Sequence, residues 1–214
     1  MPGDEQQTSD EQLAAEAQDG SLEAFGGLVD RYHARIYHFL CHKTANPEDA
    51  QDVTQLVFIR AWQKIHQFRV EAKFVTWLFT ITRRAAINHY RARGSRTMVE
   101  LKEADGKLVT SDTPASNLAE RDEHAALWAA ARRNLKDSQF TVLWLKYREG
   151  MSIKETALAM GKRPVTIKVL LHRARKALGT ALRRPDVKSK SSQPTQPFLP
   201  PKLKHEMTLQ AGVA

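Results

Sequence analysis

Apolar residues that recur three or four positions apart most constrain the fold of this 214-residue chain. One such segment carries Phe25, Leu28, Tyr32, Ile36 and Phe39. This spacing places apolar side chains on one face of a helix, so that the face can be buried. Sustained alternation of apolar and polar residues, which is typical of a half-buried strand, does not occur in the sequence. The sequence therefore predicts an all-α protein.

Capping and breaking residues divide the helical pattern into segments. Ser9, Ser21 and Pro47 stand where helices are expected to begin. Stretches rich in Ser, Thr, Asp, Gly and Pro interrupt the pattern and indicate flexible chain. The predicted organisation is a small helical domain (residues 9–93), a flexible linker (94–115), a second small helical domain (116–184) and a disordered, proline-rich tail (185–214).

The second predicted domain contains a helix-turn-helix pattern. A short apolar helix, Ile153 to Met160, ends at Gly161 and precedes a basic helix pattern. In this motif the second helix enters the major groove of DNA, where Lys and Arg bond to guanine edges or phosphates. The residues whose spacing predicts contact with DNA are Thr166, Lys168, Val169, His172 and Arg173.

Composition narrows the class of protein further. The net charge of +9 is concentrated in basic segments of the chain, which favours a polyanionic partner. Cys41 is the single cysteine, so no intramolecular disulfide can form and a reducing cytoplasm is predicted. No segment approaches 18 uninterrupted apolar residues, so no membrane insertion is expected. His38, Cys41 and His42 lie close in sequence but complete no four-ligand set, so neither a metal nor a cofactor is predicted.

Three short motifs in the C-terminal part carry a family resemblance. They are Ser-Ile-Lys-Glu-Thr-Ala at Ser152–Ala157, Thr-Ile-Lys at Thr166–Lys168, and His-Arg-Ala-Arg-Lys-Ala-Leu at His172–Leu178. Together they resemble region four of bacterial sigma factors, and most closely the extracytoplasmic-function (ECF) group, which keeps only regions two and four. LuxR-type regulators share a similar pattern in this part, so these motifs alone leave both families open.

The segment Asp49 to Trp62 resembles the polymerase-binding helix of sigma region two. The resemblance implies that a polar stripe on this helix docks on RNA polymerase, where acidic groups supply charge complementarity. The family usually has an acidic residue where this chain has Leu56, so a charged contact is exchanged for an apolar one. The residues implied in polymerase binding are Asp49, Asp52, Gln55 and Leu56.

The segment Phe74 to Arg93 resembles the part of region two that reads the −10 promoter element. Holding a single DNA strand requires cations along the backbone and a platform or pocket for an unstacked base. The loop Gln67–Ala72 resembles the family's base-capturing loop. The family commonly has Asn where this chain has Arg84, and Asp where it has Asn88. The residues implied in −10 binding are Phe68, Arg84, Asn88 and Arg91.

These resemblances imply a cytoplasmic sigma factor that binds core RNA polymerase and promoter DNA and catalyses no covalent chemistry. They imply that Thr166, Lys168, Val169, His172 and Arg173 read the −35 promoter duplex. They also imply an anti-sigma factor as a partner. A LuxR-like regulator would bind duplex DNA without polymerase, but no βα pattern for a receiver domain is present. A basic nuclease or RNA-processing enzyme would need clustered carboxylates, and a ribosome-associated protein would have no use for the Asp49 to Trp62 helix.

Overall fold

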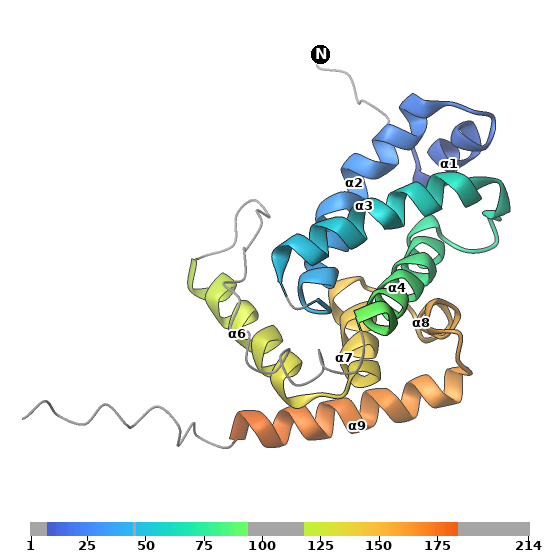
Figure 1. Cartoon of the computed structure of the whole chain (residues 1–214). Coiled ribbons are helices and arrows are strands. Elements are labelled where there is room, and N and C mark those ends of the chain that lie inside the picture. Colours follow the sequence, from blue (N-terminus) through green and yellow to red (C-terminus); the bar gives the residue numbers. More distant parts are fainter. Residues whose placement is uncertain (1–7, 45, 94–117, 184–214) are drawn as a thin grey trace, which may run out of the picture. The chain divides into compact units, whose positions relative to one another are not determined.

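The computed structural model describes residues 8–44, 46–93 and 118–183, and every regular element within these ranges is helical. This confirms the all-α prediction. The predicted linker and the predicted tail lie outside the described residues. In chain order the helices (Figure 1) are α1 (Asp10–Gln18), α2 (Leu22–Cys41), α3 (Pro47–Lys64), the 3-10 turn η1 (Ile65–Gln67), α4 (Phe74–Arg93), α6 (Leu118–Asn134), α7 (Asp137–Leu143), the π-helical turn η2 (Trp144–Arg148), α8 (Ile153–Met160) and α9 (Pro164–Arg183).

Side-chain caps fix where the first three helices begin. At α1, Ser9 Oγ accepts a hydrogen bond from the Gln12 N–H at 3.1 Å, and Gln12 Oε1 accepts one from the Ser9 N–H at 3.0 Å. Ser21 caps α2 in a similar way, and Asn46 caps α3 with Pro47 at its first position. Because these side chains satisfy backbone donors that a helix start leaves free, the helix starts follow the caps found in the sequence.

Helices α1 to α4 bury a shared apolar core. Helix α2 packs against α1, α3 and α4 (Figure 1), and its Ile36 and Phe39 are fully buried. Rings from separate helices meet here: the Phe39 centroid lies 5.5 Å from that of Phe79, and the Phe25 centroid lies 5.1 Å from that of Trp62. Burying aromatic rings removes large apolar areas from water, so this core holds α3 and α4 at fixed places on α2.

Helix α9 is the element against which the C-terminal helices assemble. Helices α6, α7 and α8 all contact it. The inner face of α9 carries Ile167, Leu171 and Ala174, which are almost completely buried. The basic residues of α9 therefore remain on the opposite side of the helix, as its amphipathic pattern predicts.

One helix departs from the expected geometry. The sequence predicts a continuous helix from Asp137 to Glu149, but α7 ends at Leu143 and the chain continues as the π-helical turn η2. Trp144 and Leu145, the first two residues of this turn, are both buried. A π-helical turn holds more residues than an α-helical one, so the residues after Leu143 face other directions than α-helical spacing predicts.

Candidate nucleic-acid and polymerase interface

The connection between α8 and α9 has the geometry of a helix-turn-helix. At the start of α8, the Glu155 N–H donates to Ser152 Oγ at 3.2 Å and the Ser152 N–H donates to Glu155 Oε2 at 2.6 Å. The hydrogen bonds from Ser152 lower the pKa of Glu155 to about 2. Gly161 ends α8 at φ 60°, a left-handed conformation that favours glycine. Helix α9 then begins at Pro164.

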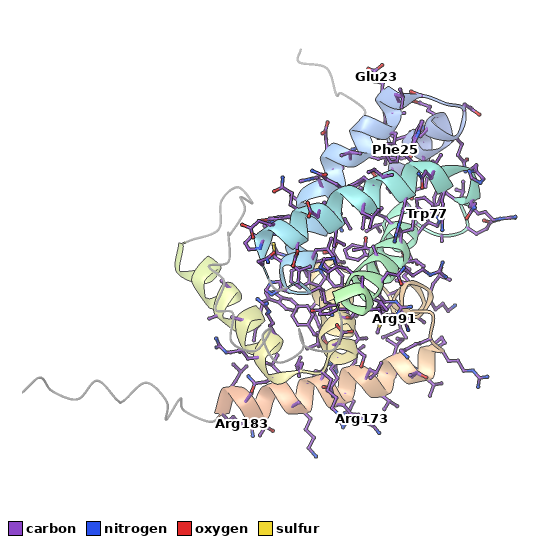
Figure 2. All side chains as sticks on the ribbon, viewed as in Figure 1. Glu23, Phe25, Trp77, Arg91, Arg173 and Arg183 are labelled. Atoms are coloured by element: carbon purple, nitrogen blue, oxygen red, sulfur yellow. The ribbon has the colours of Figure 1, made fainter. Side chains whose placement is uncertain are left out.

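The side of α9 that faces away from the core presents all of the residues predicted to read the −35 element. Helical spacing places them within about half of the helix circumference. Figure 2 shows Arg173 on the outer side of α9, with Arg183 further along the same helix. The exposed residues of this −35 face are Thr166, Lys168, Val169, His172 and Arg173.

A second exposed face lies on α4. Arg84, Asn88 and Arg91, which are four and three residues apart, are all exposed, whereas Ala85 and Ala86 are buried against the core. The structure therefore brings the three predicted −10 residues of α4 together on one side of the helix. This −10 face carries two guanidinium groups and one amide, which suits a nucleic-acid backbone and a base edge.

Phe68 occupies a different environment from the one expected. It is 4% exposed, and its ring centroid lies 5.6 Å from that of Phe74 and 5.6 Å from that of Trp77. The predicted role of Phe68 is to line a pocket for an unstacked base, and the structure shows that its ring is buried against two aromatic neighbours instead of lying open at the surface. An apolar ring beside two other rings gains more from burial than from exposure, so Phe68 supports the loop from below. Arg69 and Val70, the next two residues, are the exposed ones.

The polar stripe of α3 is shorter than the sequence suggests. Asp52 and Gln55 are exposed and Leu56 is partly exposed. Asp49 is only 4% exposed, and its Oδ2 lies 3.6 Å from Nε2 of His89. Asp49 lies three residues before the exposed Asp52 and four residues before the buried Val53, so helical spacing is compatible with either side of α3. In the structure Asp49 lies on the buried side, with Val53. The expectation that Asp49 shares the exposed stripe is thus corrected.

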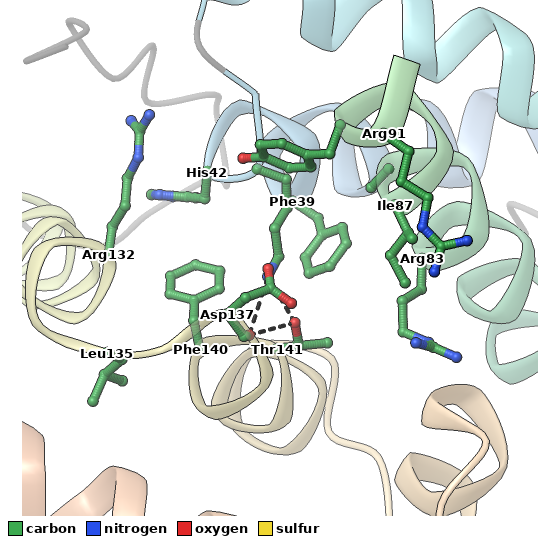
Figure 3. A pocket seen from close by; sticks show the side chains of 13 residues that line it. Phe39, His42, Arg83, Ile87, Arg91, Arg132, Leu135, Asp137, Phe140 and Thr141 are labelled. Atoms are coloured by element: carbon green, nitrogen blue, oxygen red, sulfur yellow. Dashed lines mark hydrogen bonds and ion pairs between the residues drawn. The ribbon is translucent and has the colours of Figure 1, made fainter. Parts of the chain in front are cut away.

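A pocket of about 330 Å³ lies where residues from the N-terminal helices meet residues from α6 and α7 (Figure 3). Lys43 lies at this meeting point and is 5% exposed. Its Nζ donates to Asp137 Oδ1 at 2.5 Å and to Thr141 Oγ1 at 2.7 Å. Burial lowers the pKa of Lys43, and the Asp137 carboxylate opposes that shift. The residues that line the pocket beside them include Phe39, His42, Arg83, Ile87, Tyr90, Arg91, Arg132 and Phe140.

Below pH 6.5 the protein is expected to lose stability, because His42 is buried as a neutral ring. Its centroid lies 5.0 Å from that of Trp144 and 5.3 Å from that of Phe140. Burial, with a smaller contribution from the Arg132 charge, lowers the pKa of His42 from 6.5 to about 3. The unfolded chain gains this proton near pH 6.5 and the folded chain does not, so the stabilisation is complete above pH 6.5 and is lost as pH falls toward 3.

Between pH 7 and pH 5 the free energy of unfolding is therefore expected to fall by about 1–2 kcal/mol, as measured by urea denaturation. His38, whose pKa burial also lowers, acts in the same direction. The matched variant His42→Phe keeps a buried ring and removes the titrating group. Its unfolding should depend less on pH, and an unchanged pH dependence would contradict the assignment to His42.

Within residues 8–44, 46–93 and 118–183, no group of three or more His, Cys, Asp or Glu side chains is placed to bind a metal ion. Cys41 is half-buried, and burial raises the pKa of its thiol. None of the described helices is long and apolar enough to cross a membrane.

Comparison with known proteins matches both halves of the chain. The family model of Sigma-70 region 2 matches residues 28–96, which include the α3 stripe and the −10 face. That of Sigma-70, region 4 matches residues 130–178, which include the helix-turn-helix. The ECF RNA polymerase sigma factor BldN of Streptomyces coelicolor is 32% identical over 172 residues, which are 80% of this chain and 65% of BldN.

Two further similarities agree with these matches. The RNA polymerase sigma-H factor of Pseudomonas aeruginosa is 32% identical over 184 residues, which cover 82% of this chain and 95% of that protein. The solved structure of CnrH in complex with the cytosolic domain of CnrY gives a TM-score of 0.59 at 25% identity, covering 82% of this chain and 97% of that one. Fold and site thus define a helical protein of transcription initiation. The chain belongs to the sigma-70 family of RNA polymerase sigma factors, in its ECF group. A LuxR-type regulator finds no support in these matches.

Proposed function

We propose that this protein binds core RNA polymerase and directs it to promoters, reading a −35 duplex with α9 and holding a −10 strand with α4. One observation carries the proposal: the same chain exposes the −35 face of α9 and the −10 face of α4. Contacts to phosphates position a protein on DNA, and contacts to base edges supply sequence specificity. Both kinds of side chain are present on each face.

Within the −35 face, each side chain has a role that follows from its chemistry. Lys168 and Arg173 donate hydrogen bonds to guanine edges or phosphates, and Val169 offers an apolar surface to a thymine methyl group. His172 contacts or stacks on a base, and Thr166 bonds to a backbone phosphate near the start of the helix. Both cationic side chains are exposed, so DNA can reach them without displacing other helices.

The −10 face would act on a single strand. Arg84 and Arg91 neutralise its phosphates, and Asn88, between them on the same side of α4, hydrogen bonds to a base edge. The family commonly has Asn where Arg84 stands and Asp where Asn88 stands, so this face is more positive than is usual. The loop with Arg69 and Val70 lies just before α4 and would hold the unstacked base.

Polymerase would dock on the α3 stripe, now reduced to Asp52, Gln55 and Leu56. We also propose an anti-sigma factor that covers such binding surfaces. The solved complex of CnrH, a similar protein, with the cytosolic domain of CnrY supports a protein partner of this kind. The proposed role is binding without covalent chemistry, in the cytoplasm, where polymerase and promoter DNA occur together.

The test is run-off transcription with purified core polymerase, this protein and a promoter library. Transcripts from a defined subset of promoters are expected only when both proteins are present. Active core and correctly folded protein that give no promoter-specific transcript would overturn the proposal. Binding to duplex DNA without polymerase would favour a regulator, and cleavage of the DNA would favour a nuclease.

Leu56→Asp is expected to make binding to core polymerase tighter at low salt and more dependent on salt. The change adds a carboxylate beside Asp52 at a position where the family is usually acidic, and exposed charge pairs weaken as ionic strength rises. Core affinity can be measured at two salt concentrations. Leu22→Asp is the matched control, because Leu22 is 70% exposed and lies on α2. Core affinity that is identical in wild type and Leu56→Asp at both salt concentrations would remove Leu56 from the interface.

A further inference from the structure

Helix α1 lies outside residues 28–96, which the region 2 family model matches, yet it is firmly attached to the helices that follow. Its Ala14 and Ala17 are completely or almost completely buried. Asp10 forms an ion pair with Arg31 at 2.8 Å and also accepts a hydrogen bond from the Tyr32 hydroxyl. The start of α1 is therefore fixed on α2, and its far end is held at a defined place.

That far end reaches the loop that precedes α4. Helix α1 contacts both η1 and α4. Gln18, its last residue, donates from Nε2 to the Ile65 carbonyl at 2.9 Å and to the Phe68 carbonyl at 2.8 Å. A primary amide has two N–H donors, and both donate here to backbone carbonyls at the two ends of the turn η1. Gln18 thus links Ile65, where η1 begins, to Phe68, where the loop begins.

The same turn is held from two other sides. The Phe68 N–H donates to the Ile65 carbonyl at 2.9 Å, which closes η1, and the Phe68 ring is buried against Phe74 and Trp77. The next residues, Arg69 and Val70, are exposed, and Val70 is 65% exposed. The position of these exposed residues therefore depends on three contacts: the buried Phe68 ring, the hydrogen bond that closes η1 and the amide of Gln18.

We propose that Gln18 is a positioning residue. It holds the loop after Phe68 at a fixed position relative to the −10 face of α4, and thereby determines selectivity for the −10 strand. The inference rests on the proposed function, because it assigns a role within the −10 site. Gln18 itself is not assigned any contact with DNA. It acts through the Ile65 and Phe68 carbonyls, which no side chain lacking a hydrogen-bond donor can hold in the same way.

The test compares Gln18→Glu and Gln18→Ala with wild type as assembled holoenzyme, on promoters with a constant −35 element and randomised −10 positions. Glu has nearly the same shape but brings a carboxylate, which cannot donate, against two carbonyl oxygens. Both variants are expected to lose roughly tenfold in −10 sequence discrimination, since small misplacements at a recognition site have large effects. Affinity for core and preference at −35 should not change. Gln63→Glu is the matched control, with an exposed glutamine on α3.

The outcomes separate the two proposals. If wild-type holoenzyme itself shows no −10 discrimination, the −10 part of the proposed function fails and the role of Gln18 fails with it. If wild type discriminates and both Gln18 variants keep the same −10 preference, only the inference about Gln18 is overturned. It is also overturned if the variants lose core binding, −35 preference and thermal stability together, because Gln18 would then serve the fold as a whole.

Discussion

Replacing Phe74 with alanine is expected to lower the free energy of unfolding by about 3–5 kcal/mol, the usual cost of removing a buried aromatic side chain. Phe74 is 1% exposed and is the first residue of α4. Its ring centroid lies 5.5 Å from that of Tyr32, and 5.6 Å from those of Phe68 and Trp77. Alanine would leave a cavity between α2, α4 and the loop, which these rings fill together.

Urea denaturation at constant pH measures this loss directly. Leu22→Ala is a suitable control, because Leu22 is 70% exposed and its truncation should change stability by less than about 0.5 kcal/mol. A Phe74→Ala protein whose free energy of unfolding lies within about 1 kcal/mol of the wild-type value would mean that the surrounding rings collapse into the space. The ring contacts would then contribute less to stability than their geometry suggests.

Lys168→Ala and Arg173→Ala are each expected to reduce discrimination between the preferred −35 sequence and its single-base variants by about 1–3 kcal/mol. Both side chains are exposed on the −35 face of α9, where they can reach base edges in the major groove. If either residue contacts only phosphate, its loss will weaken binding to all sequences about equally and reduce the salt dependence instead. The measurement is holoenzyme binding or transcription on a −35 library at constant salt.

Arg183→Ala provides the matched control for these two variants. Arg183 is exposed on the same helix, and its substitution removes the same charge. It lies about 15 Å beyond Arg173 along the helix axis. It should weaken overall affinity slightly and leave the sequence preference intact. Unchanged −35 preference in both Lys168→Ala and Arg173→Ala would refute the reading face assigned to α9.

The fold could be predicted well from the sequence because its main signals are local. Ser9, Ser21 and Pro47 each mark the beginning of a helix in the structure, as expected from capping chemistry. Apolar spacing predicted the buried face of α2 correctly. The change to a π-helical turn after Leu143 was missed, because the sequence spacing that predicts an α-helix carries no signal for where the backbone widens.

The candidate site was predicted less completely, since parts of it depend on contacts between distant segments. Asp49 has sequence neighbours that fit both a polar and a buried stripe, and only the packing of α3 against α4 decides between them. Phe68 is aromatic and lies in a loop, so the sequence cannot distinguish a base platform from an anchor. The hydrogen bonds of Gln18 to Ile65 and Phe68 join segments far apart in the chain, which periodicity cannot reveal.

The burial of Lys43 has a consequence for the chemistry of this side chain. A lysine amine reacts with acylating reagents only when its nitrogen is accessible and has lost its proton. With Asp137 and Thr141 bonded to it and 5% of the residue exposed, that nitrogen is shielded while α7 stays in place. The acylation rate of Lys43, compared with that of the exposed Lys168, would therefore measure how often the contact between Lys43 and α7 opens.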